Sequence, residues 1–290
     1  MPYRIKDFSD VQAEIRRIGH EQVDRALAAL DVSGDDAMGG LHEARRRAKK
    51  LRGLARLVRK AVDEDAYRRL NQHFRDTARH ASAGRDLEAF IEAYDRLCDR
   101  YQDQIDRRAF GSIRAGLTRR LQEYEAGRPL IDALNLDASG FGAVAGGLHK
   151  TYRRAHHRLA DAAGKPKAKR FHAWRKRVKY HRYHLKLLRD IWPGPMAAVG
   201  EEASRLGDLL GDAHDLHELR TSLGDNADGL GNPDDVAAFL KLAAGRQEQL
   251  ERQAIIAGRR LFVMKPKRLK SSLSIYQKSA GRLKACDGVE

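Results

Sequence analysis

Two stretches of the sequence combine a leading histidine with regularly spaced arginines and lysines. The first is LHEARRRAKKLRGLARLVRK at 41–60, and the second, 130 residues further on, is FHAWRKRVKYHRYHLKLLRD at 171–190. Arginine offers a forked pair of hydrogen-bond donors and lysine a compact positive charge, so together they suit the oxygens of phosphoryl groups. These residue types therefore predict binding of a phosphate-rich anion.

The two stretches share their charged positions much more than their apolar ones, because only Leu57 and Leu187 are identical among the apolar pairs. A single charged run is usually a solvated helix face. Solvation alone does not require two runs to match position by position, so the repeat favours a binding role. The matched pairs are His42 and His172, Arg45 and Arg175, Arg46 and Lys176, Arg47 and Arg177, Lys49 and Lys179, Arg52 and Arg182, Arg56 and Lys186, and Arg59 and Arg189.

Helical geometry separates the charged positions from a second line of small and apolar residues. At roughly 100° per residue, positions 42, 45, 49, 52, 56 and 59 align, and so do their counterparts at 172–189. Positions 41, 44, 48, 51, 55 and 58 hold Leu, Ala, Ala, Leu, Ala and Val, and the equivalent line in the repeat holds Phe, Trp, Val, His, Leu and Leu. We expect the second line to pack into a core and the cationic line to lie at the margin of that core, facing a groove between helices.

Composition narrows the partner to an anion without identifying it. The chain has 290 residues, of which 33% are charged, and 56 Lys and Arg against 40 Asp and Glu give a net charge of +16. Nucleic acid, anionic lipid or an anionic polymer would all fit. Carboxylates on neighbouring helices could also neutralise the cationic lines internally. Aromatic residues make up only 7% of the chain, and Trp174, Tyr180 and Tyr183 have no aromatic counterparts in the first stretch, which disfavours stacking on bases.

The termini and cysteines favour a soluble cytoplasmic protein. The sequence begins with MPYRIKDFSD, which has no apolar core of a signal peptide, and no apolar run reaches the roughly 18 residues that span a bilayer. Cys98 and Cys286 are far apart and in no metal-binding spacing, so we expect free thiols.

Almost every segment has helical periodicity, and none alternates long enough to predict a strand. The repeat also extends beyond the basic helices, since GRDLEAF at 84–90 matches AHDLHEL at 213–219 and places Asp86 over Asp215, each expected near a helix N-terminus. Breaks are expected at SGDDAMGG (33–40), GRPL (127–130), WPGP (192–195) and GLGNPDD (229–235), and Pro266 suits a first helical turn. The predicted helices are Phe8–Leu30, Leu41–Val62, Glu64–Ala81, Asp86–Arg108, Phe110–Ala126, Ser139–Ala162, Lys167–Trp192, Met196–Leu210, Asp212–Leu223, Asp234–Ala257 and Pro266–Leu283.

The histidines do not by themselves predict a metal centre. His214 and Asp215 form an adjacent pair, but the first half has Arg85 at the position of His214. His181 falls on the packing line, where a hydrogen-bonded core histidine is expected. The sequence has no dinucleotide-binding, phosphate-loop, nucleophile or zinc-protease motif. No metal or cofactor is expected.

These features resemble the conserved-histidine α-helical domain, the CHAD family, whose paired basic helices have the form HxxRxxxKxxR. Here the motifs are His42-Arg45-Lys49-Arg52 and His172-Arg175-Lys179-Arg182. GLHKTYRRAHHRL (147–159), LLGDAHDLHEL (209–219) and LFVMKPKRL (261–269) are also similar to the family. The resemblance covers about residues 5–285, as one domain made of two repeats at about 5–130 and 139–285.

The resemblance implies an all-α fold of two helical bundles related by a pseudo-twofold axis, with a central basic pore or groove. It also implies a non-catalytic binder of inorganic polyphosphate, and for such a binder we expect association with polyphosphate granules. Members are sometimes fused to a triphosphate tunnel domain, but no strand alternating Glu and Lys is present, which favours binding over catalysis. The implied ligands are His42, Arg45, Lys49, Arg52 and Arg56 from one helix and His172, Arg175, Lys179, Arg182 and Lys186 from the other, with Arg46, Lys176, Lys150 and Arg153 in a second rank.

Two alternatives remain open from the sequence. The protein could be an enzyme that processes polyphosphate, through a phosphohistidine on His42 or His172 or through a metal. It could also be a generic nucleic-acid binder. For the leading hypothesis, we expect the two histidines to be hard to protonate beside cations and easier once phosphate is bound, so that binding tightens at mildly acidic pH.

Overall fold

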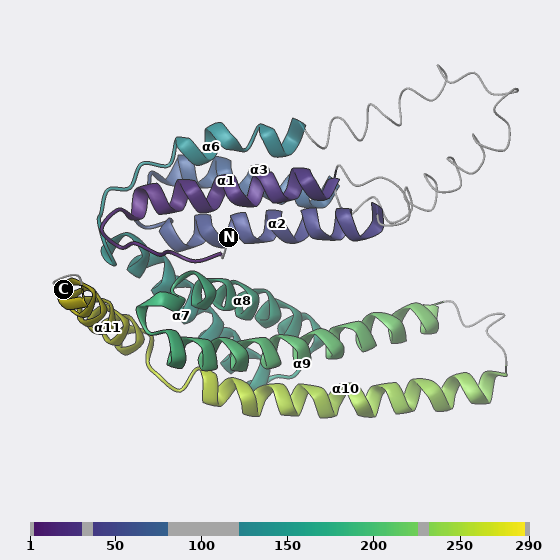
Figure 1. Cartoon of the computed structure of the whole chain (residues 1–290). Coiled ribbons are helices and arrows are strands. Elements are labelled where there is room, and N and C mark those ends of the chain that lie inside the picture. The colour runs from purple at the N-terminus through teal and green to yellow at the C-terminus, as the bar shows by residue number, and fades with distance from the viewer. Residues whose placement is uncertain (1–2, 31–36, 81–121, 226–231, 288–290) are drawn as a thin grey trace, which may run out of the picture. The chain divides into compact units, whose positions relative to one another are not determined.

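The computed structural model describes residues 3–30, 37–80, 122–225 and 232–287 (Figure 1). Within these ranges the regular elements are all helices and no strand is present, so the predicted all-α class is confirmed. The chain divides into two compact units, Met1–Val144 and Ala145–Glu290. The predicted repeats at about 5–130 and 139–285, their union in one domain and their pseudo-twofold relation stay predictions.

The described part of the first unit contains the helices that hold the basic segment 41–60. They are α1 (Val11–Leu30), α2 (Ala37–Val58), α3 (Glu64–His80) and α6 (Arg128–Asp132). Helix α2 packs against both α1 and α3, and α6 lies against α1 and α3. Asp10 caps the start of α1, because its Oδ1 accepts a hydrogen bond from the Ala13 backbone N–H at 2.9 Å. The basic helix α2 is therefore held on two sides by its own unit.

The described part of the second unit is a bundle of four helices with a further helix at its C-terminal end. Its elements are α7 (Gly142–Gly164), which begins at the end of the first unit, α8 (Ala168–Leu187), the 3-10 turn η2 (Arg189–Ile191), α9 (Pro193–Asp225), α10 (Pro233–Leu261) and α11 (Pro266–Asp287). Trp174, Leu206 and Ala254 from α8, α9 and α10 meet Tyr152 and Leu159 of α7 in a single core. Helix α11 lies against η2, and the ring of its Tyr276 stands 4.6 Å from that of Trp192.

The predicted packing lines of both basic helices are confirmed as core. On α2 the residues from Leu41 to Val58 in this line are at most 6% exposed. On α8 the line from Phe171 to Leu188 is at most 4% exposed and includes His181. The expected hydrogen bond at His181 is missing at one ring nitrogen, since its Nδ1 has no partner. Its ring lies instead 5.2 Å from that of Tyr152 and 5.6 Å from that of Phe262.

Several predicted helix boundaries were wrong. Helix α9 continues through the break expected between Leu210 and Asp212, so Asp215 lies inside a helix and not at an N-terminus. Helix α2 begins at Ala37, within the segment expected to be a break, and α6 begins where GRPL was expected to interrupt the chain, with Pro129 in its first turn. Pro266 begins α11 as predicted. The predictions for Asp86, Cys98 and the helices at 86–108 and 110–121 lie outside the described residues.

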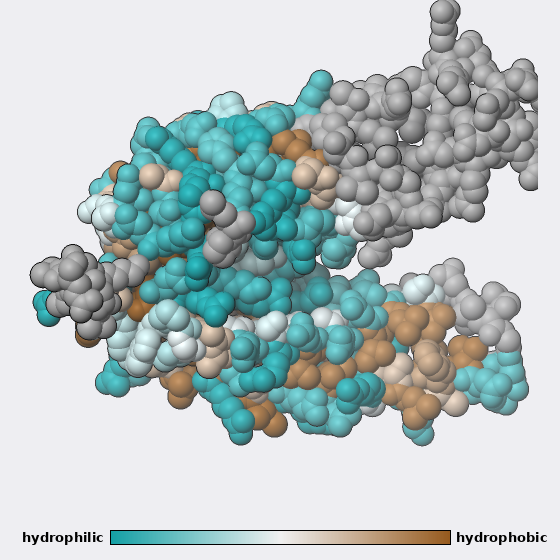
Figure 2. All heavy atoms as spheres, in the orientation of Figure 1, coloured by the Kyte–Doolittle hydropathy of each residue, from teal (hydrophilic) through white to brown (hydrophobic). Residues whose placement is uncertain are grey.

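Most of the visible surface is hydrophilic, and an apolar area lies over the neighbouring ends of α9 and α10 (Figure 2). Leu219, Phe239 and Leu242 are 41%, 48% and 74% exposed there. Within the described ranges, no helix is long and apolar enough to cross a membrane.

Candidate anion-binding surfaces

The cationic residues of α8 lie at the edge of the second unit's core. His172, Arg175, Lys179 and Arg182 are half-buried, and Lys186 is exposed. We call these five residues the α8 stripe. Their intermediate burial follows from the geometry of the helix, because the stripe is only about 100° from the line that packs into the core. The prediction that the stripe lies at the margin of the core is confirmed for this helix.

Small residues of α9 lie directly beside the α8 stripe. The Arg182 guanidinium donates from Nη1 to Ser204 Oγ at 3.0 Å. One turn further along, a Cβ added at Gly207 would be 4.0 Å from the same Nη1. A Cβ added at Gly211 would be 3.5 Å from Nη2 of Arg175. Ser204, Gly207 and Gly211 therefore leave the space in which the two guanidinium groups lie.

The histidine at the start of the α8 stripe is paired with a histidine of α9. The rings of His172 and His214 are 4.5 Å apart, and His214 Nδ1 lies 3.7 Å from Glu218 Oε1. The pKa of His172 is lowered by its burial and then by the charges of Lys176, His214 and Arg175, with only Glu218 acting in the opposite direction. These effects disfavour the protonated imidazole in the free protein, and a bound anion would act in the opposite direction.

The corresponding residues of α2 have a similar placement in the first unit. Arg45, Lys49, Arg52 and Arg56 are half-buried and His42 is exposed, and we call these five residues the α2 stripe. Arg56 donates from Nη1 to the Arg52 carbonyl at 2.9 Å, and Arg52 Nε points to Asn71 Oδ1 of α3 at 3.5 Å. The α2 stripe therefore also runs along the boundary with a neighbouring helix.

The two stripes differ in their countercharge. Glu43 of α2 forms ion pairs with both Arg46 and Arg47, whereas the aligned position in α8 is Ala173. Arg47 is buried and also donates to Gln22 Oε1 of α1 at 3.0 Å. The internal neutralisation considered from composition therefore occurs near the start of α2. Arg46, a second-rank candidate, is one of the groups that it neutralises.

The remaining second-rank candidates occupy other positions. Lys176 is exposed on α8, next to His172. Lys150 is half-buried and Arg153 is exposed on α7. Arg153 lowers the pKa of His149 together with Lys267 and Lys270 of α11, after the larger effect of burial. Arg153 is thus associated with the first turns of α11.

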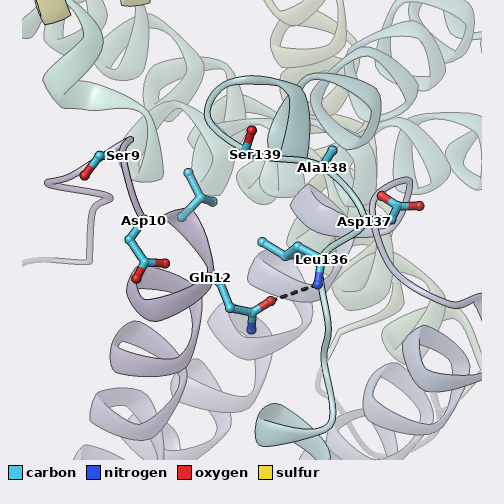
Figure 3. A pocket seen from close by; sticks show the side chains of 8 residues that line it. Ser9, Asp10, Gln12, Leu136, Asp137, Ala138 and Ser139 are labelled. Atoms are coloured by element: carbon cyan, nitrogen blue, oxygen red, sulfur yellow. Dashed lines mark hydrogen bonds between the residues drawn. The ribbon is translucent and has the colours of Figure 1, made fainter.

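The hollow drawn in Figure 3 has a different chemistry. It lies in the first unit between the start of α1 and residues 136–139, and Gln12 spans it by accepting from the Leu136 N–H at 2.8 Å. The charged side chains in its lining are Asp10 and Asp137. An acidic lining repels polyanions, so this hollow is not part of the anion-binding surfaces. Nor does any group of three or more His, Cys, Asp or Glu at metal-binding spacing occur in the described ranges.

Sequence reasoning missed the contribution of α9. Ser204, Gly207, Gly211 and His214 follow one another at steps of three, four and three residues, which is the spacing of one helix face. That spacing was visible in the sequence, but glycine and serine do not by themselves indicate a ligand. These residues matter because α9 places them against Arg182, Arg175 and His172 of α8.

The structure is therefore that of an all-α protein with two half-buried cationic helix faces, each within its own unit. The model of the CHAD domain matches residues 17–224, and the chain belongs to this family. A comparison with curated proteins found no match.

Proposed function

We propose that this protein binds inorganic polyphosphate without catalysing its turnover. The observation that supports the proposal most directly is the pair of stripes. Five aligned positions on each helix, ten residues in all, are His, Arg or Lys at the same helical spacing, and they lie along the edges of two separate cores. Membership of the CHAD family supports the same reading of these residues.

The chemistry of the stripes suits a flexible linear polyanion. Guanidinium groups donate two parallel hydrogen bonds to phosphate oxygens, and the lysines add charge between them. Binding releases counterions condensed on the chain, so affinity should fall steeply with salt. Arg175 and Arg182 are held over small residues of α9, which reduces the freedom that they lose when they bind.

A role as a generic nucleic-acid binder is less well supported. Single-stranded nucleic acids are usually held by aromatic side chains that stack on bases. Trp174 and Tyr183 of α8 are 0% and 3% exposed, so neither offers a stacking surface. Equal affinity for DNA and polyphosphate would nevertheless favour this alternative.

The second alternative is an enzyme that processes polyphosphate. His172 has a neighbouring histidine and cations, which could position a phosphoryl group for transfer to the imidazole. Release of orthophosphate, shortening of the chain or an acid-labile phosphohistidine would favour catalysis. We propose binding alone, in the cytoplasm, with recruitment to polyphosphate granules as its cellular consequence.

The test is a calorimetric titration of long-chain polyphosphate into wild type and the Arg45→Ala/Arg175→Ala variant. Two lost charge-assisted contacts should cost about 3 kcal/mol, roughly a hundredfold in affinity. The control is Arg69→Ala/Arg259→Ala, which removes one exposed arginine from each unit and the same total charge. A DNA oligomer is titrated in parallel. Equal losses in the two variants, or comparable binding of DNA, would overturn the proposal.

A further inference from the structure

A second group of cations lies in the second unit, where α7 comes close to the start of α11. The Tyr152 hydroxyl of α7 donates to the Met264 carbonyl at 3.0 Å, and its ring lies 5.2 Å from that of Phe262. These contacts fix the chain two residues before α11 begins at Pro266. The first turns of α11 are therefore held beside the turn of α7 that surrounds Tyr152.

The residues brought together in this way are positively charged. His149 and Arg153 are four residues apart on α7 and therefore share one face of the helix, and Tyr152 lies between them in the sequence. Lys267 and Lys270 occupy the first two turns of α11. The half-buried His149 imidazole has its pKa lowered by burial and then by Arg153, Lys270 and Lys267. The three cations are thus close enough to disfavour a further positive charge on the same imidazole.

Nothing in the described part of the chain neutralises these cations. Arg153, Lys267 and Lys270 are exposed, and within the described ranges the charged side chain of none of them forms a hydrogen bond or an ion pair. The N-terminal end of α11 adds the positive end of a helix dipole to the same place. Like charges held together cost free energy unless an anion answers them.

We propose that Arg153, Lys267 and Lys270 form a second contact region that holds part of a bound polyphosphate chain. This inference rests on the proposed function and extends it to the basic C-terminal segment. The three cations lie on two helices of one unit, so an extended phosphoryl chain can contact both helices at once. A long chain that is already bound at the α8 stripe of the same unit can gain a second, intramolecular contact at this region.

The experiment compares Lys267→Ala/Lys270→Ala with Lys278→Ala/Arg282→Ala in the full chain. Both variants remove two exposed cations from α11, but only the first removes those beside α7. Affinity for long-chain polyphosphate should fall about tenfold in the first variant, roughly threefold per cation. The slope of log affinity against log salt should decrease by about 1.4, at about 0.7 per contact. The second variant should stay within about twofold of wild type.

A histidine titration followed by NMR checks the geometry without ligand. The pKa of His149 should be higher in Lys267→Ala/Lys270→Ala than in wild type and unchanged in Lys278→Ala/Arg282→Ala. An unaltered pKa in the first variant would show that the lysines do not gather at His149, and would overturn the inference.

The remaining outcomes separate this inference from the proposed function. No binding of polyphosphate by wild type would overturn both. Binding by wild type with equal effects of the two α11 variants would leave the stripes as the site and overturn the second region alone. Loss of binding to anionic lipid vesicles, with polyphosphate affinity unchanged, would assign the lysines to a membrane surface and also overturn it.

Discussion

Acidification should destabilise this protein through His181, which is enclosed in the core of the second unit. Its side chain is 1% exposed, lies against the rings of Tyr152 and Phe262, and has no hydrogen-bond partner at Nδ1. Burial lowers the pKa of His181 from 6.5 to about 4. The folded protein therefore holds this imidazole neutral over a pH range in which the unfolded chain takes up a proton.

The sign and size of the effect follow from this difference in pKa. The contribution of His181 to the free energy of unfolding is fully present above about pH 6.5. It is lost as the pH drops towards 4, because the unfolded state binds the proton first. A difference of roughly 2.5 pH units corresponds to about 3 kcal/mol in total, of which about 2 kcal/mol should already be lost at pH 5. Against a typical stability of about 5–15 kcal/mol, such a loss is readily measured.

The assay is urea unfolding of wild type and His181→Leu between pH 7.5 and 4.5. Leucine is the natural replacement, because Leu51 occupies the aligned position of α2 and is 1% exposed. Other titrating groups are common to both proteins, so the difference in unfolding free energy isolates His181. That difference should shift by about 2 kcal/mol in favour of the variant between pH 7.5 and 5. A difference that stays constant with pH would refute the reasoning, and the exposed His157→Gln serves as the control that should track wild type.

Three further predictions concern the stripes and the packing between helices. Glu43→Ala should strengthen polyphosphate binding up to about fivefold, because it frees the exposed Arg46 guanidinium of its countercharge, and unchanged affinity in calorimetry would contradict this. Gly258→Ala should lower the free energy of unfolding by about 1–3 kcal/mol, since the new Cβ would lie 2.5 Å from the Trp174 ring. Gly207→Ala, with 4.0 Å of space, should retain that stability or gain up to about 1 kcal/mol, so denaturation midpoints that rank the two variants otherwise would count against this packing. Polyphosphate binding should tighten from pH 8 to 5, because burial and neighbouring cations lower the pKa of His172 in the free protein and bound phosphate opposes that effect. An affinity that does not change with pH would exclude this role. A pH dependence that persists in His172→Asn would exclude it as well.

The sequence predicted the packing of the two basic helices well, because their periodicity is strong and directly reflects burial. The positions of Leu41 and Ala44, or of Phe171 and Trp174, could be assigned to the core from spacing alone. Helix α9 was divided wrongly at Gly211, because glycine and aspartate are weak local helix formers. Packing against α8 and α10 overrides that local preference and carries the helix through to Asp225.

The charged residues of the site could be predicted from the sequence, but the residues of other helices that contact them could not. The α8 stripe follows from residue type and spacing within one helix. The contacts of Arg182 with Ser204 and of His172 with His214 depend on which helix lies alongside, and no local pattern encodes that. The countercharge at Glu43 was present in the sequence, but its significance depends on side-chain conformations that bring it to two arginines at once.

The glycines of α9 also bear on how the second unit folds. Glycine costs roughly 1 kcal/mol of helix stability relative to alanine at each interior position, and α9 has Gly200, Gly207 and Gly211 within its 33 residues. Helix α3 of the first unit, by contrast, contains no glycine in its 17 residues. An isolated α9 peptide should therefore be largely unfolded, with its helix forming only as α8 and α10 assemble around it. The segment that gives the arginines their space thus depends on the helices packed against it for its own structure.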